Sequence, residues 1–227
     1  MSVSWYLPVV VTTTQPQRKD AQRNRQRILE AAKELFAERG LGVTLHDIAD
    51  RASVGIGTIY RHFPDKSMLI DIVFEAQLEH MVELLEEAIA DPDPWHAVVW
   101  FHERALEEQA LDRGLKELLL GIPEAPQRAV RIRERLHPLA AQLIERAKAA
   151  GEVRADCETQ DFGVIQLMVG AVIDAAHDVS PDIWRRYLGI ALQGLRPASV
   201  PLEPMVVPAV SPQQMEELLV GAWKNRS

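Results

Sequence analysis

The segment TLHDIADRASVGIGTIYRHFPDK, residues 44–66, decides how the N-terminal part of this 227-residue chain folds. Its first half predicts a short helix, because Thr44 can cap a helix N-terminus and Asp47, three residues later, can complete a weaker form of the capping box. Val43 before the cap and Ile48 inside the helix can form a hydrophobic staple. We therefore expect a helix to begin directly after Thr44.

The second half of the segment predicts a tight turn and another short helix. Residues 53–55 (Ser-Val-Gly) form the turn, in which Gly55 is available for a left-handed conformation. Ile59 and Phe63 are four residues apart and share the inner face of the second helix, which Pro64 ends. Two short helices around a tight turn predict a helix-turn-helix motif.

The outer face of the second helix is short and polar, which suits a helix that enters the DNA major groove, about 12 Å wide. The residues on this face are Gly57, Thr58, Arg61 and His62. Arg61 can pair with guanine O6 and N7, and Thr58 can contact a thymine methyl group or a phosphate. Tyr60 can reach sideways to a phosphate, and Lys66 in the first turn of the next helix can clamp one. Double-stranded DNA is therefore the expected partner.

The charge distribution agrees with a DNA contact at one end of the chain. The formal net charge is −8, which by itself argues against a nucleic-acid partner. Residues 1–66 contain ten Lys and Arg against seven Asp and Glu, a charge of +3, whereas the remainder carries −11. A basic N-terminal part on an acidic body is expected when only one end touches a polyanion. Chance clustering on a solvated surface is the alternative.

The rest of the chain follows the helical period, and no run alternates cleanly enough to predict a strand. A first helix from about residue 20 ends at Gly40, and a long helix runs from Asp65 to Ala90. Further helical segments are expected at 94–112, 114–121, 124–150, 159–178 and 182–195. The expected fold class is all-α.

Composition suggests four parts and a cytoplasmic location. The parts are a mobile N-terminal arm (1–19), a helix-turn-helix domain (20–66), a helical body (67–196) and a Pro-rich linker with a short C-terminal helix (197–227). Cys157 is the single cysteine, which fits a reducing compartment. The longest near-apolar stretch, 163–173, is about half the ~20 residues that a membrane-spanning helix needs. We expect a soluble protein without a membrane partner.

The segment around the helix-turn-helix resembles a known family. Residues 44–49 and 53–66, together with 28–40, are similar to the DNA-binding signature of TetR-type regulators. The specific part is Gly-Thr-x-Tyr-x-x-Phe at 57–63, followed by Pro-x-Lys. The resemblance implies phosphate contacts at Thr44, Tyr60, His62 and Lys66, and base reading at Gly57, Thr58 and Arg61.

One position departs from the family pattern. Ile56 stands where the family often has a lysine or arginine that touches DNA, which puts one contact in doubt. Arg23, Arg25 and Arg27 could compensate, or they could form an ordinary charged face of the first helix. The sequence leaves both readings open.

The resemblance also implies an N-terminal three-helix domain joined by a long helix to a ligand-binding and dimerisation domain. A homodimer closed by the last two main helices is expected. The residues expected in this interface are Gly170, Ile173, Trp184, Tyr187, Leu188 and Ala191. Packing of these residues inside the core of one protomer is the alternative.

An effector pocket is expected in the body, because pockets combine apolar walls with a few polar groups. The candidate residues are His96, Trp100, Phe101, Arg104, Gln166 and Asp174. The alternative places the tryptophans in the core and the histidines on the surface.

The expected function is a ligand-responsive transcriptional regulator, a repressor that binds a near-palindromic operator as a homodimer. A small, largely apolar effector would tilt the long helix and change the spacing of the two DNA readers. No catalytic motif, no zinc-type spacing and no cofactor loop is found, so neither enzyme activity nor a metal or cofactor is expected. A constitutive DNA binder, an activator, and a helical ligand-binding or interaction module with a vestigial helix-turn-helix are the alternatives.

Overall fold

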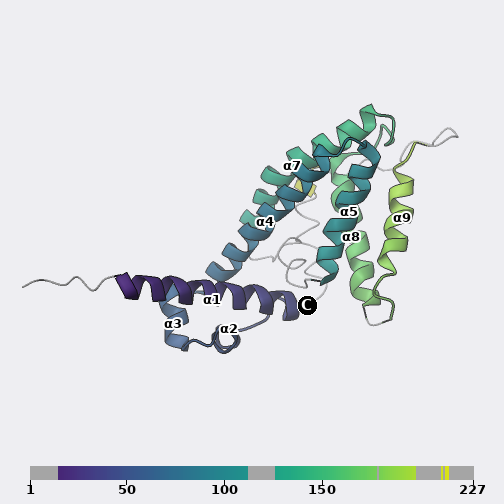
Figure 1. Ribbon diagram of the computed structural model, residues 1–227. Coiled ribbons are helices and arrows are strands. Elements are labelled where there is room, and N and C mark those ends of the chain that lie inside the picture. Colours follow the sequence, from purple (N-terminus) through teal and green to yellow (C-terminus); the bar gives the residue numbers. More distant parts are fainter. Residues whose placement is uncertain (1–14, 112–125, 178, 198–210, 212, 215–227) are drawn as a thin grey trace, which may run out of the picture.

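The computed structural model describes residues 15–111, 126–177, 179–197, 211 and 213–214 (Figure 1). These residues form α-helices and no strand, which confirms the all-α class. The helices are α1 (Gln15–Arg39), α2 (Leu45–Ala52), α3 (Ile56–His62), α4 (Lys66–Ala90), α5 (Pro94–Leu111), α7 (Pro126–Ala149), α8 (Thr159–Ala176) and α9 (Trp184–Gly194). The helix expected at 114–121, residues 1–14 of the arm and almost all of 198–227 lie outside the described residues.

Helix α1 begins earlier than the sequence pattern indicated. It starts at Gln15, so that residues 15–19, assigned above to a mobile arm, are helical. The reason is local, because Gln, Arg and Lys favour helices and Pro16 is tolerated in a first turn. The helix ends as expected, with Gly40 in a left-handed conformation at φ 73°.

Helix α2 begins with the expected cap. The Asp47 backbone N–H donates to Thr44 Oγ1 at 3.2 Å, and Asp47 Oδ2 accepts from the Thr44 backbone N–H at 2.7 Å. Val43 and Ile48 are buried in one core, as a staple requires. Both capping features predicted from the sequence are therefore present.

The turn between α2 and α3 differs from the prediction in one respect. Ser53, not Gly55, has the left-handed conformation, with φ 52° and ψ 49°. The left-handed residue falls directly after the last turn of α2, where the N–H groups of Ser53 and Val54 bond back to Asp50 and Ala49 carbonyls. Gly55 instead has an extended backbone and precedes α3.

Two hydrophobic cores share helix α4. The N-terminal core joins α1, α2 and α3 to the first half of α4 through residues such as Ile70, Phe74 and Leu78. The second core joins the other half of α4, from Met81, to α5, α7, α8 and α9. Figure 1 shows α4 leading from the small N-terminal unit into the body. Helix α4 is therefore packed into both cores.

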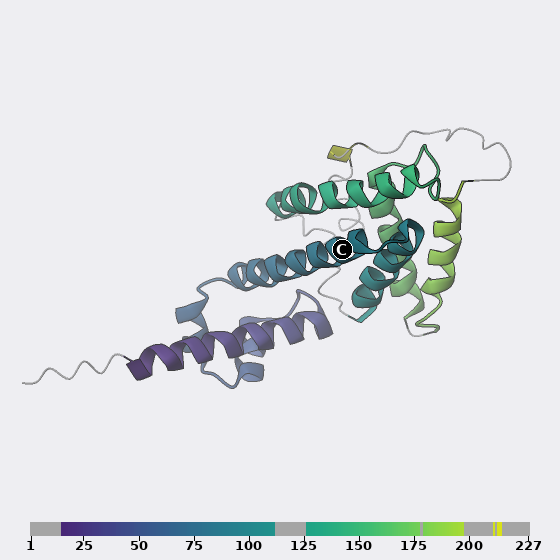
Figure 2. The same ribbon diagram turned by 45° about the horizontal axis from the view of Figure 1, so that its top comes forward.

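The body is a bundle in which α7 lies along α4 and α8 lies beside α5 and α9 (Figure 2). Arg131 of α7 pairs with Glu75 of α4, and Arg135 pairs with both Glu75 and Glu79. These pairs hold the outer edge of the α4–α7 contact. None of the helices in the described ranges combines the length and apolar character needed to span a membrane.

Candidate DNA-binding surface and body interior

Helix α3 packs onto the N-terminal core through two buried side chains. Ile59 is 0% exposed and Phe63 is 1% exposed, so this face is committed to the core. Arg25 of α1 lies over the Phe63 ring, 5.4 Å from its centroid. Arg27 donates to the carbonyl of Ser53 at 3.3 Å. Two of the arginines considered as DNA contacts therefore brace the turn and α3, while Arg23 lies near Asp20 on the exposed side of α1.

Helix α2 is fixed to α1 by a charged cluster. Arg51 donates to Glu34 at 3.2 Å and to Glu38 at 2.7 Å. The hydrogen bond from Arg51 lowers the pKa of Glu38, and the same carboxylates raise the pKa of Arg51. The cluster links α2 to α1 by ion pairs.

The opposite face of α3 is open to solvent. Gly57 and Arg61 are exposed, Tyr60 is 50% exposed, and Thr58 and His62 are partly exposed. The five residues predicted from the sequence thus share one accessible helix of about two turns. Ile56 is partly buried against the N-terminal core, which accounts for an apolar residue at the position that departs from the family pattern.

The two flanking candidates already have partners within the chain. Thr44 is exposed, and its hydroxyl lies 2.5 Å from Asp47 Oδ2 in the capping box. The Lys66 ammonium donates to the carbonyl of Leu41, which follows the end of α1. Asp65 caps α4 by accepting from the Ser67 N–H at 3.0 Å, and this bond lowers the pKa of Asp65. Lys66 therefore links α4 to the α1–α2 turn, and its role as a phosphate clamp stays a prediction.

The body interior contains a polar contact that the sequence reading did not select. His102 of α5 is 0% exposed, and its Nδ1 lies 2.9 Å from Nε2 of Gln166 on α8. Burial lowers the pKa of His102 to about 3, so the imidazole is neutral. The helical period offered a signal, because His102 shares a face with Val98, Ala105 and Leu106, all buried. A histidine that shares a helix face with apolar residues can be predicted to lie in the protein interior.

Three of the six pocket candidates lie in or against the body interior. Phe101 is 6% exposed, Trp100 packs against the core from its edge, and Gln166 contacts His102. The other three lie elsewhere. Asp174 is exposed on α8, and Arg104 lies on the surface with Glu107 at 3.5 Å and Glu108 at 3.3 Å.

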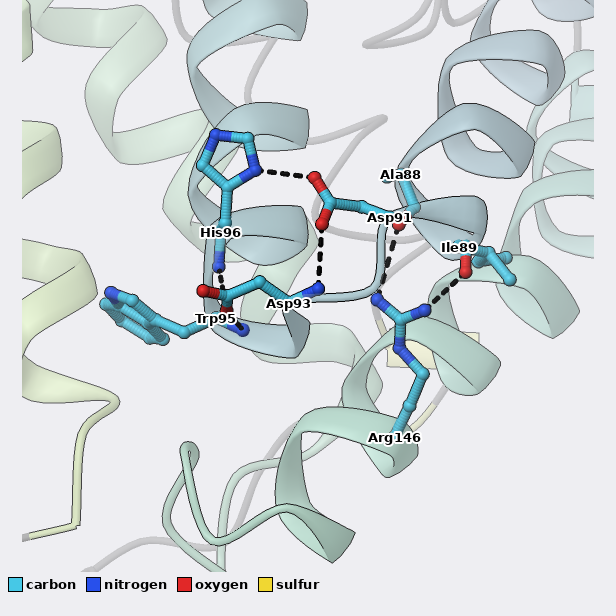
Figure 3. A network of polar contacts seen from close by, with 7 residues as sticks. All are labelled: Ala88, Ile89, Asp91, Asp93, Trp95, His96 and Arg146. Atoms are coloured by element: carbon cyan, nitrogen blue, oxygen red, sulfur yellow. Dashed lines mark hydrogen bonds and ion pairs between the residues drawn. The ribbon is translucent and has the colours of Figure 1, made fainter.

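His96 belongs to the turn between α4 and α5 rather than to the interior. Its Nδ1 lies 2.5 Å from Asp91 Oδ2, and its side chain is 60% exposed (Figure 3). Asp93 caps α5 by accepting from the N–H groups of Trp95 at 2.9 Å and His96 at 3.0 Å. Charged and polar side chains keep solvent or an ion partner, which is why His96 and Arg104 point outward.

The same turn is closed from α7. Arg146 donates to the carbonyls of Ala88, at 3.4 Å, and Ile89, both in the last turn of α4 (Figure 3). A cation at this position satisfies carbonyls that have no partner within the helix. Arg146 therefore caps α4 and fixes its distal end in the body.

The residues expected in a dimer interface are mostly buried within one protomer. Ile173, Trp184 and Leu188 are 7%, 2% and 1% exposed, and buried Gly170 faces Gln109 of α5. Ala191 is partly buried, and Tyr187 alone of this set is well exposed, at 48%. Two further large apolar side chains are exposed on these helices, Met168 of α8 at 53% and Ile190 of α9 at 58%. Ile190 lies three residues after Tyr187. Burial within one protomer is the alternative that the sequence left open for most of these residues, and the dimer interface itself stays a prediction.

Comparisons with known proteins agree with this architecture. Residues 28–72 match the model of the bacterial regulatory proteins of the tetR family, and residues 93–197 match the C-terminal domain of SbtR-like transcriptional regulators. HTH-type transcriptional regulators of Staphylococcus aureus are 48% identical over 63 residues, 27% of this chain. That match spans 34% of the length of those relatives, about a third.

Two solved structures extend the similarity through the body. A TetR transcription regulatory protein from Mycobacterium vanbaalenii is 34% identical, with a TM-score of 0.53, covering 80% of this chain and 99% of that one. The TetR transcriptional regulator SCO0520 from Streptomyces coelicolor is 27% identical, with a TM-score of 0.55, covering 77% and 99%. With an exposed recognition helix, a capped helix-turn-helix and a matching helical body, the chain belongs to the TetR family of DNA-binding transcriptional regulators.

Proposed function

We propose that this chain is a ligand-responsive repressor that binds a near-palindromic operator as a homodimer and is released by a small, largely apolar molecule. The observation that carries the proposal is helix α4, which contributes buried residues to both the DNA-binding core and the body core. A ligand in the body has a continuous helix through which to act on α3. Occupation of a promoter by the dimer would exclude the transcription machinery.

On DNA, α3 enters the major groove with its open face. Arg61 reads guanine, Thr58 contacts a thymine methyl group, and Gly57 lets the helix approach closely. Tyr60 and His62 contact phosphates at the sides of the groove, and Thr44 contacts one from the start of α2. Support for the α3 contacts comes from the shared exposure of these residues on a helix whose other face is buried through Ile59 and Phe63, and Thr44 is exposed at the start of α2.

Dimerisation uses the open faces of α8 and α9. Met168 on α8 and Tyr187 and Ile190 on α9 are exposed apolar side chains, and Tyr187 and Ile190, three residues apart, share a face of α9. A second copy of the chain would bury them about a two-fold axis, as in other homodimeric helix-turn-helix proteins. The buried residues Trp184 and Leu188 then support the interface from inside the protomer.

The switch acts through the position of α4. Its far end is held by Arg146, and its middle is tied to α7 by the Glu75 and Glu79 ion pairs. An effector that binds the released state more tightly than the operator-bound state shifts the equilibrium toward release. An effector that binds both states equally shifts nothing.

A selection of short duplexes from a random DNA pool tests the DNA-binding half of the proposal. We expect a two-fold symmetric site whose affinity falls steeply with salt, because phosphate contacts release counterions. On that site Arg61→Ala should cost about 1–3 kcal/mol and relax the preference at one base position. Lys33→Ala, which removes an exposed positive charge of α1, is the matched control and should have little effect.

The opposite outcomes separate the alternatives. If no duplex is enriched, or if Arg61→Ala changes nothing, the helix-turn-helix is vestigial and the chain is a ligand-binding or interaction module. A reporter gene placed behind the selected site distinguishes the remaining cases. Increased expression in the presence of the protein indicates an activator, and decreased expression indicates a repressor.

A further inference from the structure

The body core contains two buried polar side chains on one face of α5. Among the described residues, His102 at 0% exposure and Gln109 at 9% are the polar or charged side chains classed as buried. They are seven residues apart, or about two helical turns and 10 Å along the helix. The other buried side chains of this core, within the described residues, are apolar and run from Met81 to Leu195. Two polar groups in such surroundings need an explanation.

The contact with Gln166 decides which His102 nitrogen carries the proton. The Gln166 side-chain nitrogen is an amide donor, so His102 Nδ1, at 2.9 Å, accepts from it. Because burial keeps the imidazole neutral, its single proton then resides on Nε2. Within the described residues, Nε2 has no hydrogen-bond partner. His102 thus presents an unused N–H donor inside the body.

Gln109 presents the complementary group. Its Oε1 accepts no hydrogen bond from the part of the chain that the structure describes. The same atom lies 2.7 Å from the place where a side chain on Gly170 would begin, so it faces α8. His102 faces α8 as well, because its ring lies 4.7 Å from the ring of Phe162. A donor and an acceptor therefore both lie along the seam between α5 and α8.

The side chains around His102 and Gln109 indicate which kind of ligand could bond to them. A buried donor or acceptor without a partner costs free energy, which a bound molecule recovers by supplying the missing bond. Phe101 and Phe162 are buried beside His102, so the rest of the molecule meets apolar and aromatic walls. No charged side chain is buried in the described part of this core, so a charged ligand would lose its hydration without an ion partner.

We propose that the α5–α8 seam binds an uncharged, mainly apolar molecule that has an acceptor for His102 Nε2–H and, at a separate position, a donor for Gln109 Oε1. This inference rests on the proposed function, in which the body binds an effector, and it names the chemical class of that effector. Gln166 is a positioning residue, because its amide fixes the proton of His102 on the nitrogen that meets the ligand. The site would therefore select a ligand that is apolar in its middle and has a neutral hydrogen-bonding group at each end.

Calorimetric titration of the full chain with a matched series of probes tests the proposal. The probes are 2,6-naphthalenediol, naphthalene and 6-hydroxy-2-naphthoate, which share one ring system and differ in their polar groups. We expect the diol to bind about tenfold or more tightly than naphthalene or the carboxylate, because only the diol satisfies both groups without a charge.

Substitutions then assign the binding to the two residues. His102→Leu and Gln109→Leu should each weaken diol binding by about fivefold to tenfold, the loss of one neutral hydrogen bond, and should leave naphthalene binding unchanged. Gln142→Leu, which changes the same side chain at an exposed position of α7, should leave both unchanged. If His102→Leu does not fold by circular dichroism, Gln166→Leu replaces it, with the same expected weakening. Equal binding of diol and naphthalene, no binding of either, or equal diol binding by all variants would overturn the proposal.

The operator measured with and without the diol separates this inference from the proposed function. Diol binding that depends on His102 and releases the operator supports both. Diol binding that depends on His102 but leaves operator affinity unchanged supports the site and contradicts the switch. Operator binding by a chain that does not bind the diol contradicts the site and leaves the DNA-binding function intact.

Discussion

The Cβ of a side chain on Gly170 would lie 2.7 Å from Oε1 of Gln109, closer than a Cβ atom approaches a non-bonded neighbour. Helix α8 therefore meets α5 at a point where any side chain at position 170 would require the buried glutamine side chain to move. This contact lies within one protomer, as in the alternative of core packing that the sequence left open for Gly170. It also places the unused acceptor of Gln109 against the backbone of α8.

The first prediction uses this contact in a double-mutant cycle. Gly170→Ala in the Gln109→Ala background should raise the free energy of unfolding by about 1 kcal/mol, because alanine favours a helix and the obstructing amide is gone. In the wild-type background the same change should give no gain or a loss, since the buried glutamine must move. Denaturant unfolding of the four proteins measures both steps. An equal gain in both backgrounds would show that the contact imposes no constraint.

The helix-turn-helix could be predicted because its determinants are local. The Thr44 cap, the Asp47 partner and the end of α3 before Pro64 are set by neighbours in the sequence, and the structure has all of them. The error at the turn is instructive. A left-handed residue was expected at Gly55, where glycine makes it easy, but the end of α2 requires it at Ser53. Geometry at the helix end outweighed the preference of the residue.

The body could be predicted only in part, because its contacts are between distant residues. The helical period identified α5 and α8 as helices. It could not show that His102 meets Gln166, 64 residues away. Which apolar face meets which neighbour depends on the tertiary arrangement of helices, and one helix alone does not encode it.

The second prediction concerns the α4–α5 turn and pH. The hydrogen bond with Asp91 raises the pKa of His96 above its usual 6.5, with smaller effects from the nearby Asp93 and Glu103. The hydrogen bond with His96 lowers the pKa of Asp91, with smaller contributions from Asp93 and Arg146. The His96 contribution to stability is complete below the unfolded pKa and is lost as pH rises through the folded value. The Asp91 contribution is present above its unfolded pKa and is lost as pH falls through its lowered value.

His96→Gln should therefore lower the thermal midpoint more at about pH 5.5, where histidine is charged, than at about pH 9, where it is neutral. His46→Gln, an exposed histidine of α2, is the control and should show no such difference. Thermal unfolding followed by circular dichroism at the two pH values gives the comparison. A loss of equal size at both pH values would mean that the contact with Asp91 does not depend on charge.

The third prediction tests the dimer face. Ile190 is 58% exposed on α9, so that a charged residue there is tolerated by the protomer but not by a buried interface. Ile190→Glu should yield monomers in sedimentation velocity and weaken operator binding, since each half-site is then bound separately. Leu111→Glu, at an 86% exposed position at the end of α5, should leave the dimer intact. A dimer that survives Ile190→Glu would place the interface elsewhere.

The last prediction separates the two roles assigned to Thr44, which caps α2 and is proposed to contact a phosphate. Thr44→Ala should lower the free energy of unfolding by about 1 kcal/mol, because the Asp47 N–H loses its acceptor. Thr44→Asp can still cap the helix, so it should cost less stability. At a phosphate, however, the aspartate adds a negative charge, and Thr44→Asp should lose more operator affinity than Thr44→Ala. The two variants should therefore rank in opposite orders by stability and by operator affinity, which unfolding experiments and operator titrations measure. If affinity instead falls in step with stability, Thr44 acts on DNA only by holding α2 in place.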